Sequence, residues 1–387
     1  MTETVVAGVT IYSEFPMSYP GGGERLLSMI HQFLLEMGIE TKIIENCREN
    51  RQRNESSSKT NFECIENTGN IKFGRFGFPK FLFQDLPPIN FISNDPDALS
   101  IIFLRRVPPR SYLKKLSESQ KKVVFGLHGI SIEKLRLTHP LIVAQQLLTR
   151  LKLMDLASCA NGNINIQVLT EDMKRLMLNH GSHPKNIFLI ENEFESPLTH
   201  VGRNDEAFNV LFIGRIVNLT KGISLLKKTS RLLKKMCPNI KIKIVGTGKD
   251  SKLLNNISKN TTYFGKISDD EKFKIVQSSN LSIVTSNLEP FPRVILEFLS
   301  SGLPVVTTPS SGPSYVISKN NEYGLISSFN KKKFVNDVIG YYNLWEGNKQ
   351  AYYELKQSIA SSARATFITN RMLEAYSQMI SQILVKK

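Results

Sequence analysis

The stretch TVVAGVTIYSEFPMSYPGGGERLLSMIHQFLLEMGIETKIIE, residues 4–45, decides the fold class. Its first ten residues, 4–13, are typical of a buried strand, and a turn-rich segment with three glycines follows them. Apolar residues from Leu26 onward then recur at helical spacing as far as Gly38, and a second apolar run follows. A strand, a helix and another strand in this order predict an α/β fold with a parallel sheet.

The same pattern continues along the chain and predicts two doubly wound α/β domains. Further strands are predicted at residues 100–106, 122–129, 164–170, 186–192, 208–214, 240–246, 261–267, 281–286 and 303–308. The polar stretch 46–70 has no apolar periodicity and predicts a mobile loop, whereas the polar stretch 195–207 predicts a linker. Residues 359–380 predict a helix that continues to the end of the chain.

The composition is that of a soluble protein with room for two cores. The chain has 387 residues, of which 41% are hydrophobic and 22% are charged. Its apolar runs are shorter than a bilayer requires, and its first residues lack the basic region of a signal peptide. The four cysteines are scattered, which fits a reducing compartment and argues against a zinc site.

The charge is unevenly distributed. Residues 1–195 contain 23 basic and 21 acidic side chains, whereas residues 196–387 contain 27 basic and 13 acidic ones, within a net charge of +16. Such a basic half predicts an anionic partner, which is a nucleotide, a phospholipid surface or a nucleic acid. The alternative is that scattered lysines only keep the protein soluble.

Two loops that follow predicted strands could hold an anion, because ligands of such sheets bind at the carboxyl ends of the strands. The glycines Gly21, Gly22 and Gly23 let backbone amides approach a phosphate at a helix start, although a plain turn explains them as well. Arg215 and Lys221 can hold a diphosphate, and two solvated charges are the alternative.

The segment EPFPRVILEFLSSGLPVV, residues 289–306, holds two glutamates with seven residues between them. The prolines exclude a helix or a strand around Glu289, so this carboxylate follows the preceding strand in a loop. Helical periodicity begins at Val294 and places Glu297 about one turn into a helix. The two carboxylates can accept hydrogen bonds from hydroxyls at opposite ends of a bound sugar derivative. They need not be the acid and base of a glycosidase, which flank the scissile bond.

These motifs resemble, in their order, those of glycosyltransferase family 4, whose members are retaining, depend on a nucleotide sugar and have the GT-B fold. The motifs are GGGER, the pair Arg215 and Lys221, IVGTGKD, YFGKI and the segment that holds the two glutamates. The resemblance covers nearly the whole chain. It implies two Rossmann-like domains that face each other across a cleft. Residues 1–195 are expected on the acceptor side and 196–365 on the donor side, with a C-terminal helix over 366–387 packing back on the first domain.

The resemblance implies a role for each site residue. Glu297 would bind the ribose hydroxyls and Glu289 the hydroxyls of the transferred sugar, while Arg215 and Lys221 would neutralise the departing diphosphate. Further donor contacts are implied for Gly21, Gly22, Gly23, Lys266, Ile267, Phe291, Pro292 and Arg293.

His128 also follows a predicted strand, where members of the family often carry a histidine near the reacting sugar. A histidine satisfied at the edge of the core is the alternative interpretation. The family often has an acidic residue next, and here Gly129 takes that place, which weakens the case for a general base.

The reaction implied is transfer of a hexose-type sugar from a nucleoside diphosphate, with the anomeric configuration kept and with no metal or cofactor. Asp95-Pro96-Asp97 matches the D-x-D motif of metal-dependent enzymes of another fold, but the proline favours a turn.

The basic segment from Arg105 to Leu116 could contact an anionic membrane that carries a lipid-linked acceptor, or could simply be exposed. A cytoplasmic protein is expected, with peripheral contact to the cytosolic membrane face as an option.

Three other functions remain open at the level of sequence. One is a transferase with the same fold and a soluble acceptor, and another is an epimerase or hydrolase that acts on nucleotide sugars. A third is a non-catalytic basic protein that binds nucleic acid. The sequence shows no aromatic or arginine-rich recognition module, so no nucleic acid is expected as a partner.

Overall fold

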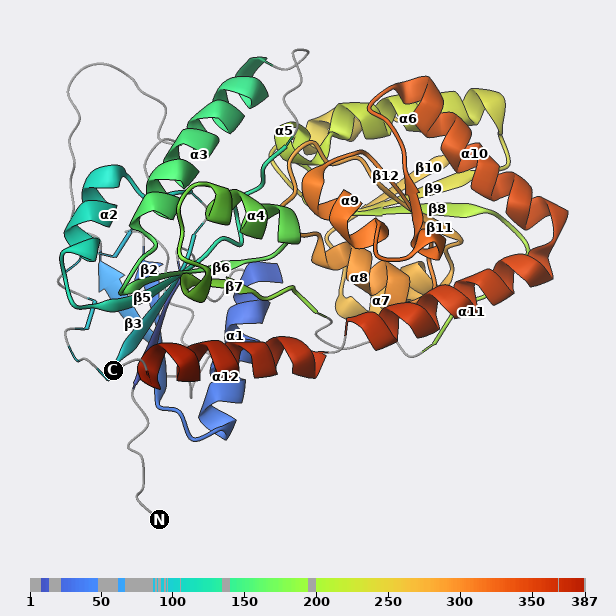
Figure 1. Cartoon of the computed structure of the whole chain (residues 1–387). Coiled ribbons are helices and arrows are strands. Elements are labelled where there is room, and N and C mark those ends of the chain that lie inside the picture. The colour runs from blue at the N-terminus through green and yellow to red at the C-terminus, as the bar shows by residue number, and fades with distance from the viewer. Residues whose placement is uncertain are drawn as a thin grey trace. The chain divides into compact units, whose positions relative to one another are not determined.

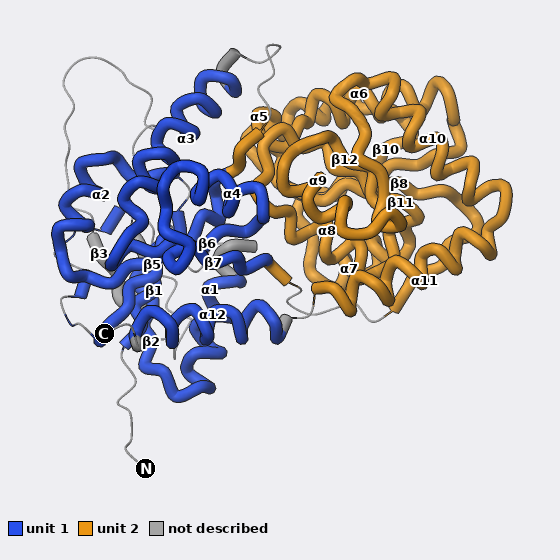
Figure 2. Tube along the Cα trace, in the orientation of Figure 1, with its two compact units in different colours: residues 1–130, 135–191, 370–387 blue, residues 131–134, 192–369 orange. Residues whose placement is uncertain are grey.

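The computed structural model divides the chain into two compact units (Figure 2). The structure describes residues 8–13, 22–47, 62–66, 86–87, 89, 92–93, 95, 97–104, 106–133, 140–193, 200–367 and 369–385. The first unit comprises Met1–Ile130, Leu135–Glu191 and Asn370–Lys387, and the second comprises Ser131–Lys134 and Asn192–Thr369. The last helix of the chain therefore belongs to the first unit.

The first unit contains a parallel sheet of seven strands in the order β3-β2-β1-β4-β5-β6-β7 (Figure 1). The strands are β1 (Val9–Ser13), β2 (Thr41–Cys47), β3 (Phe62–Glu66), β4 (Leu99–Phe103), β5 (Lys122–Gly126), β6 (Ile164–Val168) and β7 (Ile187–Leu189). The order reverses beside β1, since β2 pairs with one side of β1 and β4 pairs with the other. This is the strand order of a doubly wound sheet.

Helices cover this sheet and close its core. They are α1 (Gly22–Glu36), α2 (Arg110–Ser117), α3 (Pro140–Cys159), α4 (Glu171–Asn179) and α12 (Thr369–Val385). One face of α12 is buried in the same apolar cluster as α1 and the central strands, through Tyr376 and Ile380 among others. Burial of these side chains holds the C-terminal helix on the first unit.

The second unit repeats the plan with six strands in the order β10-β9-β8-β11-β12-β13. The strands are β8 (Asn209–Ile213), β9 (Lys241–Val245), β10 (Thr261–Gly265), β11 (Leu281–Val284), β12 (Val305–Thr307) and β13 (Gly324–Ile326). Four residues in a row, Asn209 to Phe212, are buried in β8, as expected for a central strand that is covered on both faces.

Helices follow most strands of the second unit, although only a short 3-10 turn lies between β9 and β10. They are α5 (Asn218–Lys221), α6 (Ile223–Met236), α7 (Asp269–Gln277), α8 (Arg293–Ser300), α9 (Ser311–Ile317), α10 (Lys331–Gly347) and α11 (Lys349–Thr366). Helix α7 begins with a capping box, because Ser268 accepts from the amide of Glu271 and the Glu271 side chain accepts from that of Ser268.

Two sequence predictions of secondary structure were wrong. Strands β2 and β3 both lie partly or wholly inside the polar stretch 46–70, which predicted a loop. The backbone of β3 pairs in parallel with β2 along its whole length, so ladder hydrogen bonds rather than an apolar run define this edge strand. The predicted continuous C-terminal helix is two helices, since α11 ends at Thr366 and α12 begins at Thr369.

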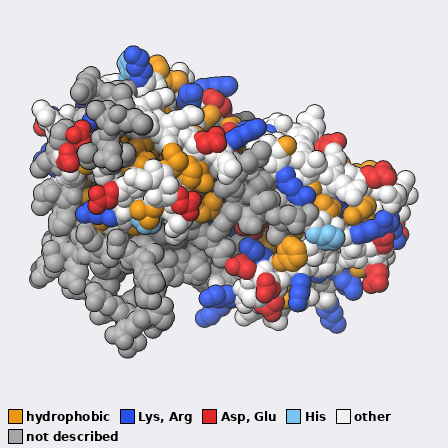
Figure 3. Space-filling view, turned by 90° about the horizontal axis from the view of Figure 1, so that it is seen from below, with side chains coloured by type: hydrophobic (Ala, Val, Ile, Leu, Met, Phe, Trp, Pro, Cys, Tyr) orange, Lys and Arg blue, Asp and Glu red, His pale blue; other side chains and the backbone are white. Residues whose placement is uncertain are grey.

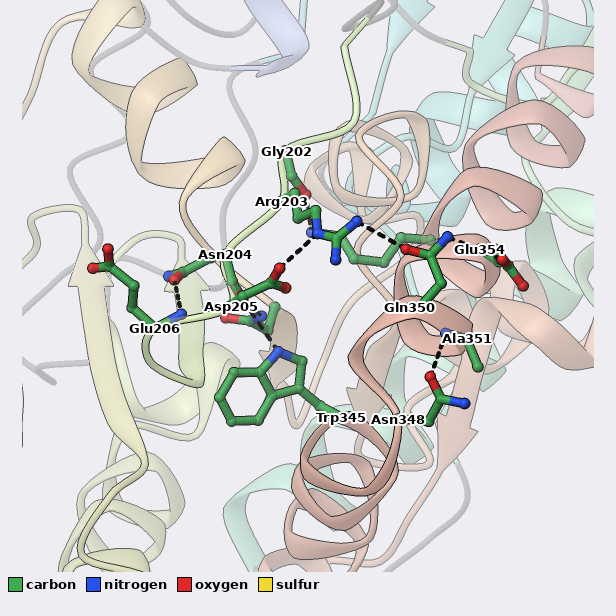
Figure 4. Close-up of polar contacts among 12 residues, drawn as sticks. Gly202, Arg203, Asn204, Asp205, Glu206, Trp345, Asn348, Gln350, Ala351 and Glu354 are labelled. Atoms are coloured by element: carbon green, nitrogen blue, oxygen red, sulfur yellow. Dashed lines mark hydrogen bonds and ion pairs between the residues drawn. The ribbon is translucent and has the colours of Figure 1, made fainter.

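The described part of the predicted linker, residues 200–207, is held firmly against the second unit (Figure 4). The indole of Trp345 donates to the carbonyl oxygen of Asn204 at 3.1 Å, and Arg203 bonds to Asp205. The ammonium group of Lys356, 2% exposed, donates to the carbonyl oxygens of Gly202 at 2.5 Å and Ser279 at 3.0 Å. Burial lowers the pKa of Lys356 to about 8.

Candidate functional site

The loop after β8 presents two cations from the second unit. Arg215 is exposed two residues beyond the strand, and Lys221 is the last residue of the short helix α5. Gly222 ends this helix with φ 63°, and a Cβ there would lie 2.0 Å from the carbonyl oxygen of Thr285. Only glycine lets the end of α5 approach the end of β11 this closely. The Thr285 hydroxyl completes the contact by donating to the carbonyl oxygen of Lys221 at 2.7 Å.

Lys221 forms an ion pair with Glu289. The ammonium group of Lys221 donates to Oε2 of Glu289, and the two side chains are only 17% and 11% exposed. Glu289 lies in the loop between β11 and α8, as the sequence predicted from its prolines. The two opposite charges therefore face each other in a place that little water reaches. The structure therefore brings together two of the predicted site residues that lie 68 positions apart.

The loop that carries Glu289 leads into the start of α8. Phe291 is 5% exposed, and Pro292 occupies the N-cap position, where no side chain caps the helix. The first amides of α8, beginning at Arg293, thus have no side-chain acceptor from the N-cap residue. The positive end of a helix dipole favours an anion at this point.

Glu297 lies one turn further along α8. Its Oε2 is 3.3 Å from the ammonium nitrogen of Lys272 on α7, and its side chain is 36% exposed. Lys272 also lies 3.5 Å from Oδ1 of Asp269. Glu297 is therefore paired with a cation as Glu289 is, but in a much wetter place.

Sequence reasoning missed a third carboxylate beside Glu289. Glu133 belongs to the short segment Ser131–Lys134 that groups with the second unit, and it is 3% exposed. Its Oε1 accepts from the amide of Glu289 at 3.3 Å, and its Oε2 accepts from the amide of Ser311 at 2.8 Å. No sequence motif marks this residue, since a single glutamate five positions after His128 has no characteristic spacing.

The end of β10 supplies two further predicted residues. Gly265 ends the strand with φ 68°, and Lys266 and Ile267 follow it directly. Lys266 is exposed and Ile267 is half-buried. Both precede the capped start of α7, the helix that carries Lys272.

The remaining predicted residues lie in the first unit. His128 follows β5, and its Nε2 lies 2.8 Å from Oε1 of Gln167 and 3.2 Å from the hydroxyl of Tyr376. The ring of Phe103 meets the imidazole edge-on at a centroid distance of 4.6 Å. The ring orientation is therefore fixed by side chains rather than by backbone groups alone.

Of the three glycines near the N-terminus, two open a helix. Gly22 and Gly23 are the first residues of α1. Gly21 lies outside the described residues.

The D-x-D triplet behaves as a turn at the two aspartates that the structure describes. Oδ1 of Asp95 accepts from the amide of Asp97 at 2.9 Å, and the carbonyl oxygen of Asp95 accepts from the amide of Ala98 at 3.1 Å. Such a local side-chain bond is typical of an aspartate that shapes a turn. Among the described residues, no three His, Cys, Asp or Glu side chains are grouped closely enough to hold a metal ion.

Figure 3 shows how the charged side chains are spread over one face of the described residues. On the face that Figure 3 shows, Lys and Arg side chains lie among Asp and Glu side chains and do not form one continuous basic stripe. A stripe of that kind is the electrostatic footprint expected of a nucleic-acid-binding surface.

Comparisons with known proteins find a sequence match in the second unit. Residues 199–358 match the sequence model of the family described as glycosyl transferases group 1, which is less than half of the 387 residues. An uncharacterized glycosyltransferase of Haemophilus influenzae is 25% identical over 151 residues, which are 38% of this chain. The match spans only 41% of that relative's length.

Solved structures match over the whole chain. The Anabaena protein HepE, crystallised with UDP and glucose, has a TM-score of 0.67 at 15% identity and aligns over 97% of this chain and 99% of its own. Sucrose-phosphate synthase from Thermosynechococcus elongatus has a TM-score of 0.72 at 14% identity, over 98% and 100%. The chain has the GT-B fold. The predicted fold class of two doubly wound α/β domains is confirmed.

Proposed function

We propose that the protein is a retaining glycosyltransferase, similar to family 4, that moves a hexose from a nucleoside diphosphate to an acceptor. The observation that carries the proposal is the buried pair of Lys221 and Glu289, at the carboxyl ends of neighbouring strands in the segment that matches the family. A cation and a carboxylate in contact provide one group for a diphosphate and one for sugar hydroxyls. Topology supports the position, because ligands of such sheets bind beside the strands where the order reverses.

In this mechanism the charged side chains stabilise the departing diphosphate. Lys221 and Arg215 neutralise the negative charge that grows as the bond from the sugar to the phosphate breaks. The backbone N–H groups of Phe291 and Arg293 donate to the phosphates at the start of α8. The acceptor hydroxyl attacks on the face from which the diphosphate leaves, and its proton passes to a phosphate oxygen of the donor. The new glycosidic bond replaces the broken one, so the anomeric configuration is kept.

The two glutamates and the remaining site residues bind the rest of the donor. Glu289 accepts from hydroxyls of the transferred sugar, and Glu297 accepts from the ribose hydroxyls. Lys266 and Ile267 frame the base. No metal ion and no cofactor takes part.

The choice of nucleotide can be tested directly. HepE was crystallised with UDP, which makes UDP-sugars the first donors to examine. A thermal-shift screen with UDP, GDP and ADP, and with UDP-glucose, GDP-mannose and ADP-glucose, should show one base that raises the melting temperature. Release of the matching nucleoside diphosphate from the sugar would then demonstrate turnover. Binding of a DNA or RNA oligonucleotide with no response to any nucleotide sugar would refute the proposal.

A specific observation favours an acceptor at a membrane. Four large apolar side chains of α3 are strongly exposed and recur at helical spacing, namely Leu147 (47%), Leu148 (50%), Leu151 (61%) and Met154 (42%). The neighbouring helix α2 carries Arg110, Lys114 and Lys115 and packs against α3. Exposed leucines beside lysines suit the headgroup region of an anionic membrane. None of the described helices is long and apolar enough to cross a bilayer. We place the proposed contact at the periphery of the cytosolic membrane face.

The membrane contact has a matched control on the same chain. Replacing Leu147, Leu148 and Leu151 by serine should weaken flotation with phosphatidylglycerol vesicles and leave nucleotide affinity unchanged. Leu344→Ser serves as the control, because Leu344 is 60% exposed but lies on α10 in the second unit. Equal flotation of all three proteins would favour the alternative of a soluble acceptor.

A further inference from the structure

The backbone of Glu289 is held from one side by the carboxylate of Glu133. Oε1 of Glu133 accepts from the amide of Glu289 at 3.3 Å and from the hydroxyl of Ser311 at 3.1 Å, and its Oε2 accepts from the amide of Ser311 at 2.8 Å. The side chain of Glu133 is 3% exposed, so these donors replace the water that a carboxylate would otherwise bind.

The same residue is held from the other side by the start of α9. The amide of Gly312 donates to the carbonyl oxygen of Glu289 at 2.9 Å, and the hydroxyl of Ser311 lies 3.4 Å from that oxygen. A Cβ on Gly312 would stand 2.6 Å from the carbonyl oxygen of Glu289 and 2.4 Å from that of Pro290. Glycine is therefore required for α9 to approach this backbone.

Both peptide groups of Glu289 are thus fixed, one by Glu133 and one by Gly312. The side chain of Glu289 has little freedom left and points at Lys221. We propose that Glu133 is a positioning residue, which holds Glu289 where the hydroxyls of the transferred sugar will lie. This rests on the proposed function and adds to it a residue that contacts neither the nucleotide nor the sugar.

The chemistry of Glu133 predicts how variants will behave. Both oxygens are used as acceptors from N–H groups, so the acceptor role needs two oxygens on one side chain. Glu133→Gln keeps one oxygen, which can still accept from one backbone amide. Its NH₂ group faces the other amide, and these two groups are both donors, so no hydrogen bond forms between them. Glu133→Ala leaves both amides unpaired in a buried place. Gln should therefore recover only part of what Ala loses.

The kinetic test compares Glu133→Ala, Glu133→Gln and the control Glu206→Ala, whose side chain is exposed. Release of UDP from UDP-glucose, or of GDP from GDP-mannose, is followed at varied donor concentration, and calorimetry measures the affinity for the free diphosphate. A misplaced Glu289 should lower kcat about 10- to 100-fold in the alanine variant, because small errors in geometry slow transfer. Affinity for the diphosphate should stay within about threefold, since neither phosphate nor ribose contacts change.

A second measurement does not depend on turnover. Hydrogen exchange of the peptides that contain Glu289 and Ser311 should be faster in both Glu133 variants than in the wild type or Glu206→Ala. Unchanged exchange, unchanged kcat, or a loss of diphosphate affinity equal to the loss of kcat would each overturn the positioning role. If the wild-type protein releases no diphosphate from any donor, the proposed function fails, and exchange alone then decides whether Glu133 holds Glu289.

Discussion

The two glutamates of the site stand in different environments, although only seven residues separate them. Glu289 has a side chain that is 11% exposed, a buried lysine partner and hydrogen bonds on both of its peptide groups. Glu297 is 36% exposed, and its partner Lys272 reaches it from the surface of α7. The comparison indicates that one end of the site is fixed before a ligand binds, whereas the other can adjust to it.

The physical reason is the dielectric around each pair. Removing one partner of a buried pair leaves an uncompensated charge and is strongly unfavourable, whereas an exposed pair contributes about 0–1 kcal/mol. In the proposed function, a fixed carboxylate suits the reacting sugar, whose geometry matters most in the transition state. An adjustable carboxylate suits the ribose, which in this proposal stays bound before and after the reaction.

The largest effect is expected at the buried pair. Lys221→Ala should slow diphosphate release by roughly 10²–10³, or about 2.7–4 kcal/mol of barrier, the usual consequence of losing one preorganised donor to a growing anion. Glu289→Ala should also lower turnover, while hardly changing the affinity for free diphosphate. Single-turnover kinetics together with calorimetry separate the two effects. Full turnover by Lys221→Ala would mean that the diphosphate binds elsewhere.

The next largest effect is expected from a substitution that changes the support of Glu289 but alters no charged residue. In Gly312→Ala the new methyl group would meet the carbonyl oxygen of Pro290 at 2.4 Å, so α9 or the loop must shift. Turnover should fall about tenfold or more, because Glu289 moves with the loop. Gly340→Ala is the control, since a Cβ at that position of α10 meets nothing within 4 Å. Equal kcat for the two variants would contradict the conclusion that the backbone of Glu289 must be held in place for turnover.

The contrast between the two ends also shows what the sequence could reveal. The parallel sheets and the capping box at Ser268 were predictable because buried apolar runs and short-range caps are local signals. The position of Glu289 in a loop followed from its prolines. Strand β3 was missed because its five residues, Phe62–Glu66, lie inside a polar stretch and are too few to give a clear pattern, whereas its backbone pairs with β2.

The residues that contact the two glutamates could not be predicted from the sequence. Lys221 lies 68 positions before Glu289, and Glu133 lies 156 positions before it, so no local pattern joins them. Lys272 was equally invisible, because it is one of many lysines on a basic chain. Only the order of the strands brings these side chains to one edge of the sheet.

At the exposed end, Glu297→Ala should weaken the binding of free diphosphate as well as that of the donor. The loss of hydrogen bonds from ribose hydroxyls to a carboxylate is worth about 1.5 kcal/mol or more, which is roughly tenfold in affinity. Calorimetry with UDP and with UDP-glucose should show the same factor for both. Normal binding of UDP by this variant would mean that Glu297 does not bind the ribose.

A smaller effect is expected for the partner of Glu297. Lys272→Met removes a half-exposed cation that lies 3.3 Å from Glu297, and such pairs contribute little in water. Affinity for UDP should change by less than about fivefold, and raising the salt concentration should shrink the difference further. A loss as large as that of Glu297→Ala would show that this end of the site is as firmly fixed as the other.

The smallest effect, none at all, is expected from removal of metal ions. Lys221 and Arg215 are proposed to neutralise the diphosphate, and Asp95 is already engaged in a turn with the amide of Asp97. Because fixed cations act on the growing charge without an ion, transfer measured in excess EDTA should match transfer measured with added MgCl₂. Transfer by Lys221→Ala is measured in the same two conditions, and we expect that added Mg²⁺ does not restore the rate that this variant has lost. A rate that collapses in EDTA and returns with Mn²⁺ would show that the buried pair does not carry the neutralisation alone.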